Sequence, residues 1–190
     1  MTDKLANLLD ELRTDHKNMI TMLELLEAES NKLYDGQDGD YELMHDVMRY
    51  MTVYPDAVHH PKEDRVYAEL QAARPDLTKG FEKIVQDHRE LAALGTKLRN
   101  DVEAILSGTA LRRNVVVADA LRYVQHLREH MRWEERDLFL RVEEMIQDGH
   151  ELIVDSELHG KTDPVFGPEV EQRFGRLFDS IQKSLTASHM

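Results

Sequence analysis

Apolar residues recur with the period of an α-helix through four long segments of the chain, at about residues 3–33, 41–73, 77–106 and 111–146. The apolar positions of the first segment are Leu5, Leu8, Leu12, Met19, Leu23 and Leu26. This spacing places them on one helix face, and no segment shows the alternation typical of a strand. Short connections between the segments favour an all-α, antiparallel four-helix bundle.

Glycine and proline mark the ends of these predicted helices. A Gly- and Asp-rich loop covers residues 35–40, Pro75 separates the second segment from the third, and Gly108 ends the third. The second segment also contains Pro55 and Pro61. Because proline removes an amide donor and crowds the preceding turn, we expect a kink or a short break there.

Residues 150–190 follow the predicted bundle of residues 1–149 and form a C-terminal extension. Residues 163–168 contain two prolines and a glycine, as a loop would. A short fifth helix is expected from about Glu169 to Leu185. It carries four apolar residues that we expect to pack on the bundle: Phe174, Leu177, Phe178 and Ile181.

Composition narrows the possible functions. The chain has 190 residues, no cysteine and a net charge of −13, so thiolate metal sites are impossible and nucleic-acid binding is not expected. It has no apolar run long enough to span a membrane. Its first residues lack the layout of a signal peptide, so we expect a cytoplasmic protein. The sequence leaves the oligomeric state open.

Six ligating side chains interrupt the apolar stripes of the four predicted helices. They are His16, His59, Glu63, His88, His130 and Glu134. A carboxylate in a core is unfavourable without a partner, and two are worse. The six positions lie near the middle of their helices and could meet at one level of the bundle, where a pair of metal ions would compensate both carboxylates.

The spacing of these residues is duplicated. A His-x-x-x-Glu pair, whose Cβ atoms lie about 5–6 Å apart on a helix, occurs at His59/Glu63 and again 71 residues later at His130/Glu134. An Asp-His pair occurs at His16 and again 72 residues later at His88. A lone His is more often structural than ligating, and a metal-free bundle with buried neutral histidines is the alternative. The duplication in phase with the apolar stripe favours a metal site.

Two neighbours of this set are less well determined by the sequence. The expected kink could turn His60 inward as a fifth imidazole ligand, but its counterpart in the second half is Met131, so the duplication does not support it. Tyr54, just before the kink, is the aromatic residue whose position allows an approach to the metals. No proton-relay residue is obvious beside the ligands.

Imidazole and carboxylate donors suit iron or manganese, and zinc also accepts them. The segments His-His-Pro-Lys-Glu-Asp at 59–64 and His-Met-Arg-Trp-Glu-Glu at 130–135 resemble the two diagnostic segments of the hemerythrin-like HHE cation-binding family. The resemblance covers roughly residues 5–146. It implies a four-helix bundle with two Fe ions, His16, His59, His88 and His130 as terminal ligands, and Glu63 and Glu134 as bridges.

The chain departs from the oxygen-carrying hemerythrins at two places. Their third helix has a His-x-x-x-His pair, where this chain has His88 and Ala92, and their fourth helix uses a His-x-x-x-x-Asp pair. The resemblance is therefore to the bacterial hemerythrin-like proteins, and it implies a small oxidant (O2, peroxide or NO) as the ligand. Turnover as an enzyme is left open. The alternative hypothesis is a sensing module in which iron loading changes the stability of the bundle.

Overall fold

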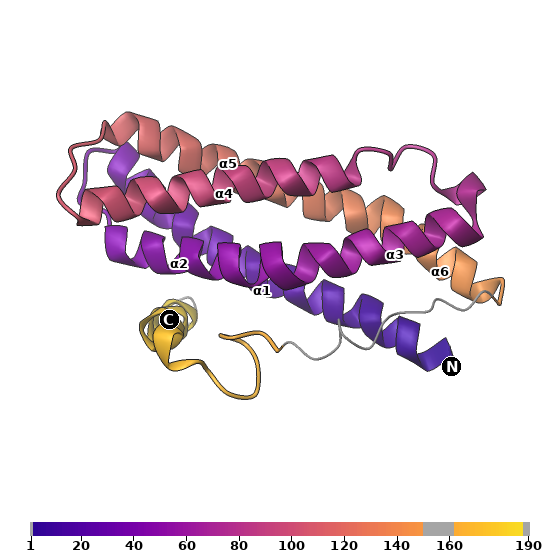
Figure 1. Ribbon diagram of the computed structural model, residues 1–190. Helices are drawn as coiled ribbons and strands as arrows, with labels where there is room; N and C mark the ends of the chain where they lie inside the picture. Colours follow the sequence, from indigo (N-terminus) through magenta and orange to yellow (C-terminus); the bar gives the residue numbers. More distant parts are fainter. Residues whose placement is uncertain (1, 150–161, 188–190) are drawn as a thin grey trace.

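The computed structural model describes residues 2–149 and 162–187, and it is helical with no strand in those ranges. Four long helical runs form an antiparallel bundle, and a short helix lies beside it (Figure 1). This confirms the expected fold class. No helix within the described ranges combines the length and the apolar character needed to cross a lipid bilayer.

The first helix, α1, covers Thr2–Tyr34. The second run consists of α2 (Tyr41–Val53), a π-helical turn η1 (Pro55–His59) and α3 (His60–Ala73). The break expected between the two prolines is therefore present. It takes the form of a π-turn, in which the His60 amide donates to the Pro55 carbonyl.

The third run begins later than the apolar pattern predicts. A 3₁₀ turn, η2, covers Pro75–Leu77, and α4 covers Ile84–Leu106. Gly80 adopts φ +98°, a left-handed conformation that a helix cannot contain. Leu77 and Phe81 therefore lie outside α4, although Phe81 is buried.

The fourth run is broken, which the sequence analysis did not predict. It consists of α5 (Arg113–Trp133), a second π-turn η3 (Glu134–Leu138) and α6 (Phe139–Gln147). No proline lies in this run, so the break has no signal in the sequence. A π-turn holds one extra residue and changes which face the following residues present, and such turns are frequent at functional sites.

The C-terminal helix also begins later than expected. A 3₁₀ turn, η5, covers Gln172–Phe174, and α7 covers Gly175–Ala187. Phe174, Leu177 and Ile181 are buried, and Phe178 is partly buried against the same core. The Arg176 guanidinium donates to Asp46 of α2 at 2.7 Å. These contacts place α7 against the bundle; residues 150–161 of the expected C-terminal extension lie outside the described residues.

Two apolar clusters fill the bundle. One contains Met19 of α1, Leu91 of α4 and Leu127 of α5 together with the buried residues of the tail. The other contains Leu12 of α1, Ile84 of α4 and Leu138 of η3. On α1, α4 and the fourth run, the ligating His lies between a residue of one cluster and a residue of the other. The candidate site is therefore a polar layer between two apolar ones.

Candidate metal centre

The structure brings all seven candidate side chains to this polar layer. They come from α1, η1, α3, α4, α5 and η3: His16, His59, His60, Glu63, His88, His130 and Glu134. None is more than 6% exposed, and both glutamates are fully buried. The π-turn η1 directs both His59 and His60 inward, so the structure adds His60 to the six residues on the stripes.

The first group consists of His16, His59 and Glu63, whose donor atoms lie within 4.8 Å of one another. Oε1 of Glu63 lies 3.3 Å from Nε2 of His16 and 3.2 Å from Nε2 of His59. Oε2 of Glu134 lies 3.5 Å from the same nitrogen of His16. Two imidazoles and two carboxylates therefore face one point.

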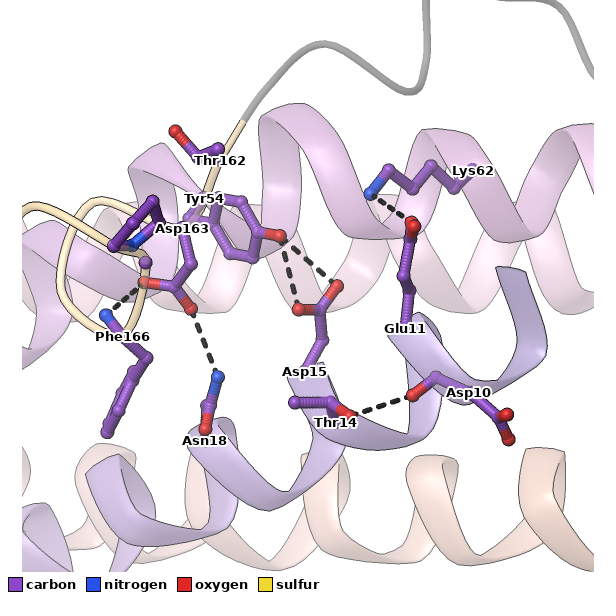
Figure 2. A pocket seen from close by; sticks show the side chains of 12 residues that line it. Asp10, Glu11, Thr14, Asp15, Asn18, Tyr54, Lys62, Thr162, Asp163 and Phe166 are labelled. Carbon is purple, nitrogen blue, oxygen red and sulfur yellow. Dashed lines mark hydrogen bonds and ion pairs between the residues drawn. The ribbon is translucent and has the colours of Figure 1, made fainter. Parts of the chain in front are cut away.

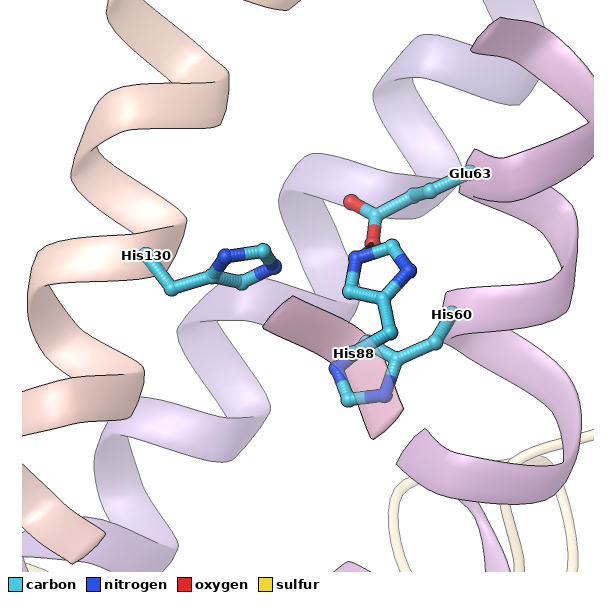
Figure 3. Close-up of side chains that lie close together, drawn as sticks. All are labelled: His60, Glu63, His88 and His130. Atoms are coloured by element: carbon cyan, nitrogen blue, oxygen red, sulfur yellow. Dashed lines mark ion pairs between the residues drawn. The ribbon is translucent and has the colours of Figure 1, made fainter. Parts of the chain in front are cut away.

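The second group consists of His60, Glu63, His88 and His130, again within 4.8 Å. Figure 3 shows these side chains converging from α3, α4 and α5. Oε1 of Glu134 lies 2.9 Å from Nε2 of His130 and 3.2 Å from Nε2 of His88. Oε2 of Glu63 lies 3.5 Å from Nε2 of His88. This point is faced by three imidazoles and the same two carboxylates.

Glu63 and Glu134 each direct one oxygen to each group, as a carboxylate does when it bridges two cations. Within the described residues, both oxygens of Glu63 and Oε2 of Glu134 have no hydrogen-bond partner. The same holds for Nε2 of four histidines: His16, His59, His60 and His130. Buried polar atoms are normally satisfied. This convergence of unsatisfied oxygen and nitrogen donors on a common space fits the ligand chemistry of a pair of cations.

Acidic side chains just outside this layer orient several of the imidazoles. His59 Nδ1 contacts Asp15 at 3.1 Å, His16 Nδ1 contacts Glu135 at 2.9 Å, and His88 Nδ1 contacts Asp64 at 2.7 Å. His60 Nδ1 faces Asp56 at the longer distance of 3.4 Å, without a hydrogen bond to its Oδ1. We call Asp15, Asp56, Asp64 and Glu135 the outer carboxylates.

An imidazole that donates its Nδ1 proton to a carboxylate keeps Nε2 free to bind a cation. The outer carboxylates were not among the residues predicted from the sequence. Their signal is an acid adjacent to a ligand: Asp15 beside His16, Asp64 beside Glu63 and Glu135 beside Glu134. In each case the carboxylate contacts Nδ1 of a histidine in another helical run.

Without cations, protonated imidazoles compensate the negative charge of the buried carboxylates in this layer. Burial lowers the pKa of His16, but Glu135, Glu63 and Glu134 outweigh it and raise that pKa to about 10. Burial likewise opposes the rise at His88, where Asp64, Glu134 and Glu63 raise the pKa to about 10. Burial favours the neutral form of Glu63, yet the neighbouring His59 and His16 hold its pKa well below the usual range. Cations entering the layer must displace these protons.

Tyr54 reaches the site through Asp15. Its hydroxyl donates to Asp15 Oδ1 at 3.1 Å, and the other oxygen of Asp15 contacts His59. Tyr54 and Asp15 line a cavity of about 530 Å³ whose other walls come from α1, Lys62 of α3 and the tail loop (Figure 2). A hydrogen-bonded line thus joins His59 to this cavity, which the sequence analysis did not foresee.

The tail contributes Asp163 to the wall of the same cavity. One oxygen of Asp163 accepts from the amides of Val165 and Phe166 at 2.8 and 2.9 Å. The other accepts from the Tyr50 hydroxyl at 2.7 Å and from the Asn18 amide at 3.3 Å. Asp163 therefore fixes the tail loop to α1 and α2.

An antiparallel helical bundle whose interior holds imidazoles and carboxylates around a common space defines a helical metal-binding domain. The family model of the hemerythrin HHE cation binding domain matches residues 7–153, and the chain belongs to this family. Comparisons with curated proteins and with solved structures found no match.

Proposed function

We propose that the chain is a non-haem di-iron protein that binds or reacts with a small oxidant: O2, peroxide or NO. The observation that supports this is the unequal donor set around two shared carboxylates. Glu63 and Glu134 face both groups, but the first group has two imidazoles and the second has three. The first group therefore leaves more room for an exogenous ligand, and iron is the metal whose redox chemistry suits this donor set.

The iron pair, when bound, supplies the electrons and the Lewis acidity for such chemistry. The chain positions it and controls its surroundings. The Phe139 ring stacks on His16 at 5.5 Å between ring centroids, which shields the first group from water. Asp15 fixes the orientation of the His59 ring through Nδ1.

Tyr54 gives this side of the centre a route for a proton. Burial, together with Asp15 and Asp163, raises the pKa of Tyr54, so the hydroxyl stays protonated and donates to Asp15. Asp15 can accept a proton from Nδ1 of His59 and lies at the wall of the cavity. This line would allow a proton to move between the cavity and the His59 ring.

The test is spectroscopic. Protein loaded anaerobically with Fe(II) is exposed separately to O2, hydrogen peroxide and NO, and absorption is recorded from the near ultraviolet to the visible. We expect about two irons per chain and a new band with at least one of the three oxidants. His16→Ala, which removes a donor of the first group, should abolish this band. No change with any oxidant beyond that of free iron would contradict the proposal.

A second candidate is iron or redox sensing through the tail. The observation that favours it is the position of Asp163 and Tyr54 in one cavity wall, with Tyr54 linked to His59 through Asp15. Iron loading would then alter how firmly the tail is held. Protease sensitivity of the tail and thermal unfolding, each with and without iron, test this. Identical behaviour in both states would exclude sensing by this route.

A further inference from the structure

The two halves of the chain differ at His130. In the first half, Asp15 precedes His16 and contacts His59 at 3.1 Å. Asp87 holds the equivalent position before His88, but it forms no hydrogen bond with His130 in the structure. Instead, Asp87 and His130 both line a second cavity of about 530 Å³.

His130 is nonetheless almost completely buried, at 6% exposure. Its Nε2 points to the centre, 2.9 Å from Oε1 of Glu134. Its Nδ1 has no hydrogen-bond partner among the described residues, whereas the Nδ1 atoms of His16, His59 and His88 each contact an outer carboxylate. In Figure 3, His130 approaches from α5 by itself, opposite His60 and His88. Among the imidazoles of the centre, the Nδ1 atoms of His16, His59, His60 and His88 each lie near an outer carboxylate, whereas that of His130 has none within ion-pairing distance in the described residues. His130 also borders a cavity directly.

The walls of this second cavity carry mostly negative charge. Its ionisable side chains, apart from His130, are Glu82, Lys83, Asp87, His126 and Glu129. Carboxylate oxygens and an imidazole nitrogen are donors for divalent transition-metal cations. With three carboxylates against one ammonium, this concave surface should raise the local concentration of cations and their rate of association. Neutral O2 or NO would gain nothing from this charge.

The first cavity is also acidic, with Asp10, Glu11, Asp15 and Asp163 in its walls, so it differs from the second in its closed inner wall and not in its charge. The Tyr54–Asp15–His59 hydrogen bonds close its inner wall, and the ammonium of the buried Lys62 stands there, 3.6 Å from Glu11. Both oxygens of Asp163 accept hydrogen bonds. A cation entering there would have to break these contacts, whereas no such contact separates the second cavity from His130.

We propose that the second cavity is the entry site through which divalent cations reach the centre, with Asp87, His126 and Glu129 as transient donors and His130 as the receiving ligand. This inference rests on the proposed metal centre. It adds a loading site to that centre that is distinct from its ligand set.

The experiment follows Co(II) uptake by metal-free protein in a stopped-flow spectrophotometer at low ionic strength. The double variant Asp87→Asn/Glu129→Gln should take up cobalt about tenfold more slowly than the wild type, in the lower range for electrostatic steering. Its final cobalt content should match the wild type, since neither residue is a ligand. Added salt should slow the wild type and bring the two rates together, because screening removes the attraction.

Two control variants make the result specific. Glu90→Gln lies on α4 and accepts from Gln86, outside the cavity, and Glu11→Gln lies in the first cavity. Both should load at the wild-type rate. Equal rates for the double variant and the wild type, or a slower rate for Glu11→Gln alone, would overturn the entry site. If the wild type itself retains no cobalt at the end point, the metal centre is wrong, which the final content shows independently of any rate.

Discussion

The two groups of candidate ligands share Glu63 and Glu134 but hold their imidazoles differently. In the first group, His16 and His59 each contact an outer carboxylate from another helical run. In the second group, His88 contacts Asp64 at 2.7 Å, whereas Nδ1 of His130 has no hydrogen-bond partner in the described part of the chain. The ligand spacing is thus duplicated in the two halves of the chain, but the carboxylate partners of the imidazoles are not.

We infer from this difference that the two sides would serve different steps. Ligands oriented by outer carboxylates keep a fixed geometry, which suits binding and reaction of an oxidant. A ligand without such support can move more easily, which suits the exchange of cations. The first group borders a cavity closed by hydrogen bonds, and the second borders one that reaches a ligand directly.

Loss of a shared carboxylate should have the largest effect because it affects both groups. We expect Glu134→Ala to lose nearly all bound iron. Glu135→Ala removes only the outer partner of His16 and should weaken binding about 10–100-fold. Metal analysis after dialysis at a fixed free-iron concentration compares the two variants. Equal losses would show that Glu134 does not have the bridging position assigned to it.

Removal of an outer carboxylate should affect one group more than the other. Asp15→Asn replaces the carboxylate that accepts from His59 Nδ1 by a neutral amide and should weaken the binding of one of the two cations about 10–100-fold. The matched variant in the second half, Asp87→Asn, should leave the equilibrium affinity unchanged, since Asp87 orients no imidazole. Competition against a chelator of known affinity measures both. An equal loss of affinity in the two variants would contradict the prediction that only Asp15 orients an imidazole ligand.

The raised pKa values predict that cation binding depends on pH. His16 and His88 have pKa values of about 10 in the metal-free fold, against about 6.5 when unfolded. Both are therefore protonated at neutral pH, and cations must displace these protons. The apparent affinity should rise with pH until about pH 10, and loading at pH 7 should release protons that an indicator dye detects in weak buffer.

The folding stability of the metal-free protein should change with pH in the opposite direction to the cation affinity. A raised pKa means that the protonated imidazoles stabilise the fold fully below the unfolded pKa, and this contribution is lost as the pH rises through the folded value. Chemical unfolding of metal-free protein should show falling stability from about pH 6.5 towards pH 10. Loading without proton release, together with a flat stability profile, would contradict the protonation assigned to this layer.

The tail should have a smaller effect, confined to stability and to the side of the first group. Asp163→Ala leaves the buried Tyr50 hydroxyl without its acceptor and should lower the free energy of unfolding by about 1–3 kcal/mol. The exposed Glu171→Ala is the control and should change it by less than about 0.5 kcal/mol. Denaturant unfolding measures both. A neutral Asp163→Ala would show that this residue does not hold the tail on the bundle.

The bundle could be predicted because its apolar stripes keep the helical period over long segments. The break at η1 was predictable because Pro55 and Pro61 force it. The break at η3 was not, since Glu134–Leu138 contains no residue that disfavours a regular helix. The late starts of α4 and α7 were also missed, because apolar residues such as Phe81 and Phe174 are buried from turns as well as from helices.

The same physical reasons limit prediction of the site. Carboxylates on apolar stripes are anomalous, so Glu63 and Glu134 could be identified from spacing alone. His60 could not be decided, because its inward direction depends on the extra residue in the π-turn. The outer carboxylates lie at the border of the solvated faces, where acids are common. Only the packing of the helical runs shows that Asp15 reaches His59.

The most direct test of the central claim is anomalous diffraction at the iron edge from crystals of the iron-loaded protein. We expect two peaks inside the bundle, both adjacent to Glu63 and Glu134, one beside His16 and His59 and the other beside His88 and His130. A single peak, or iron only at the surface with both glutamates unliganded, would contradict it.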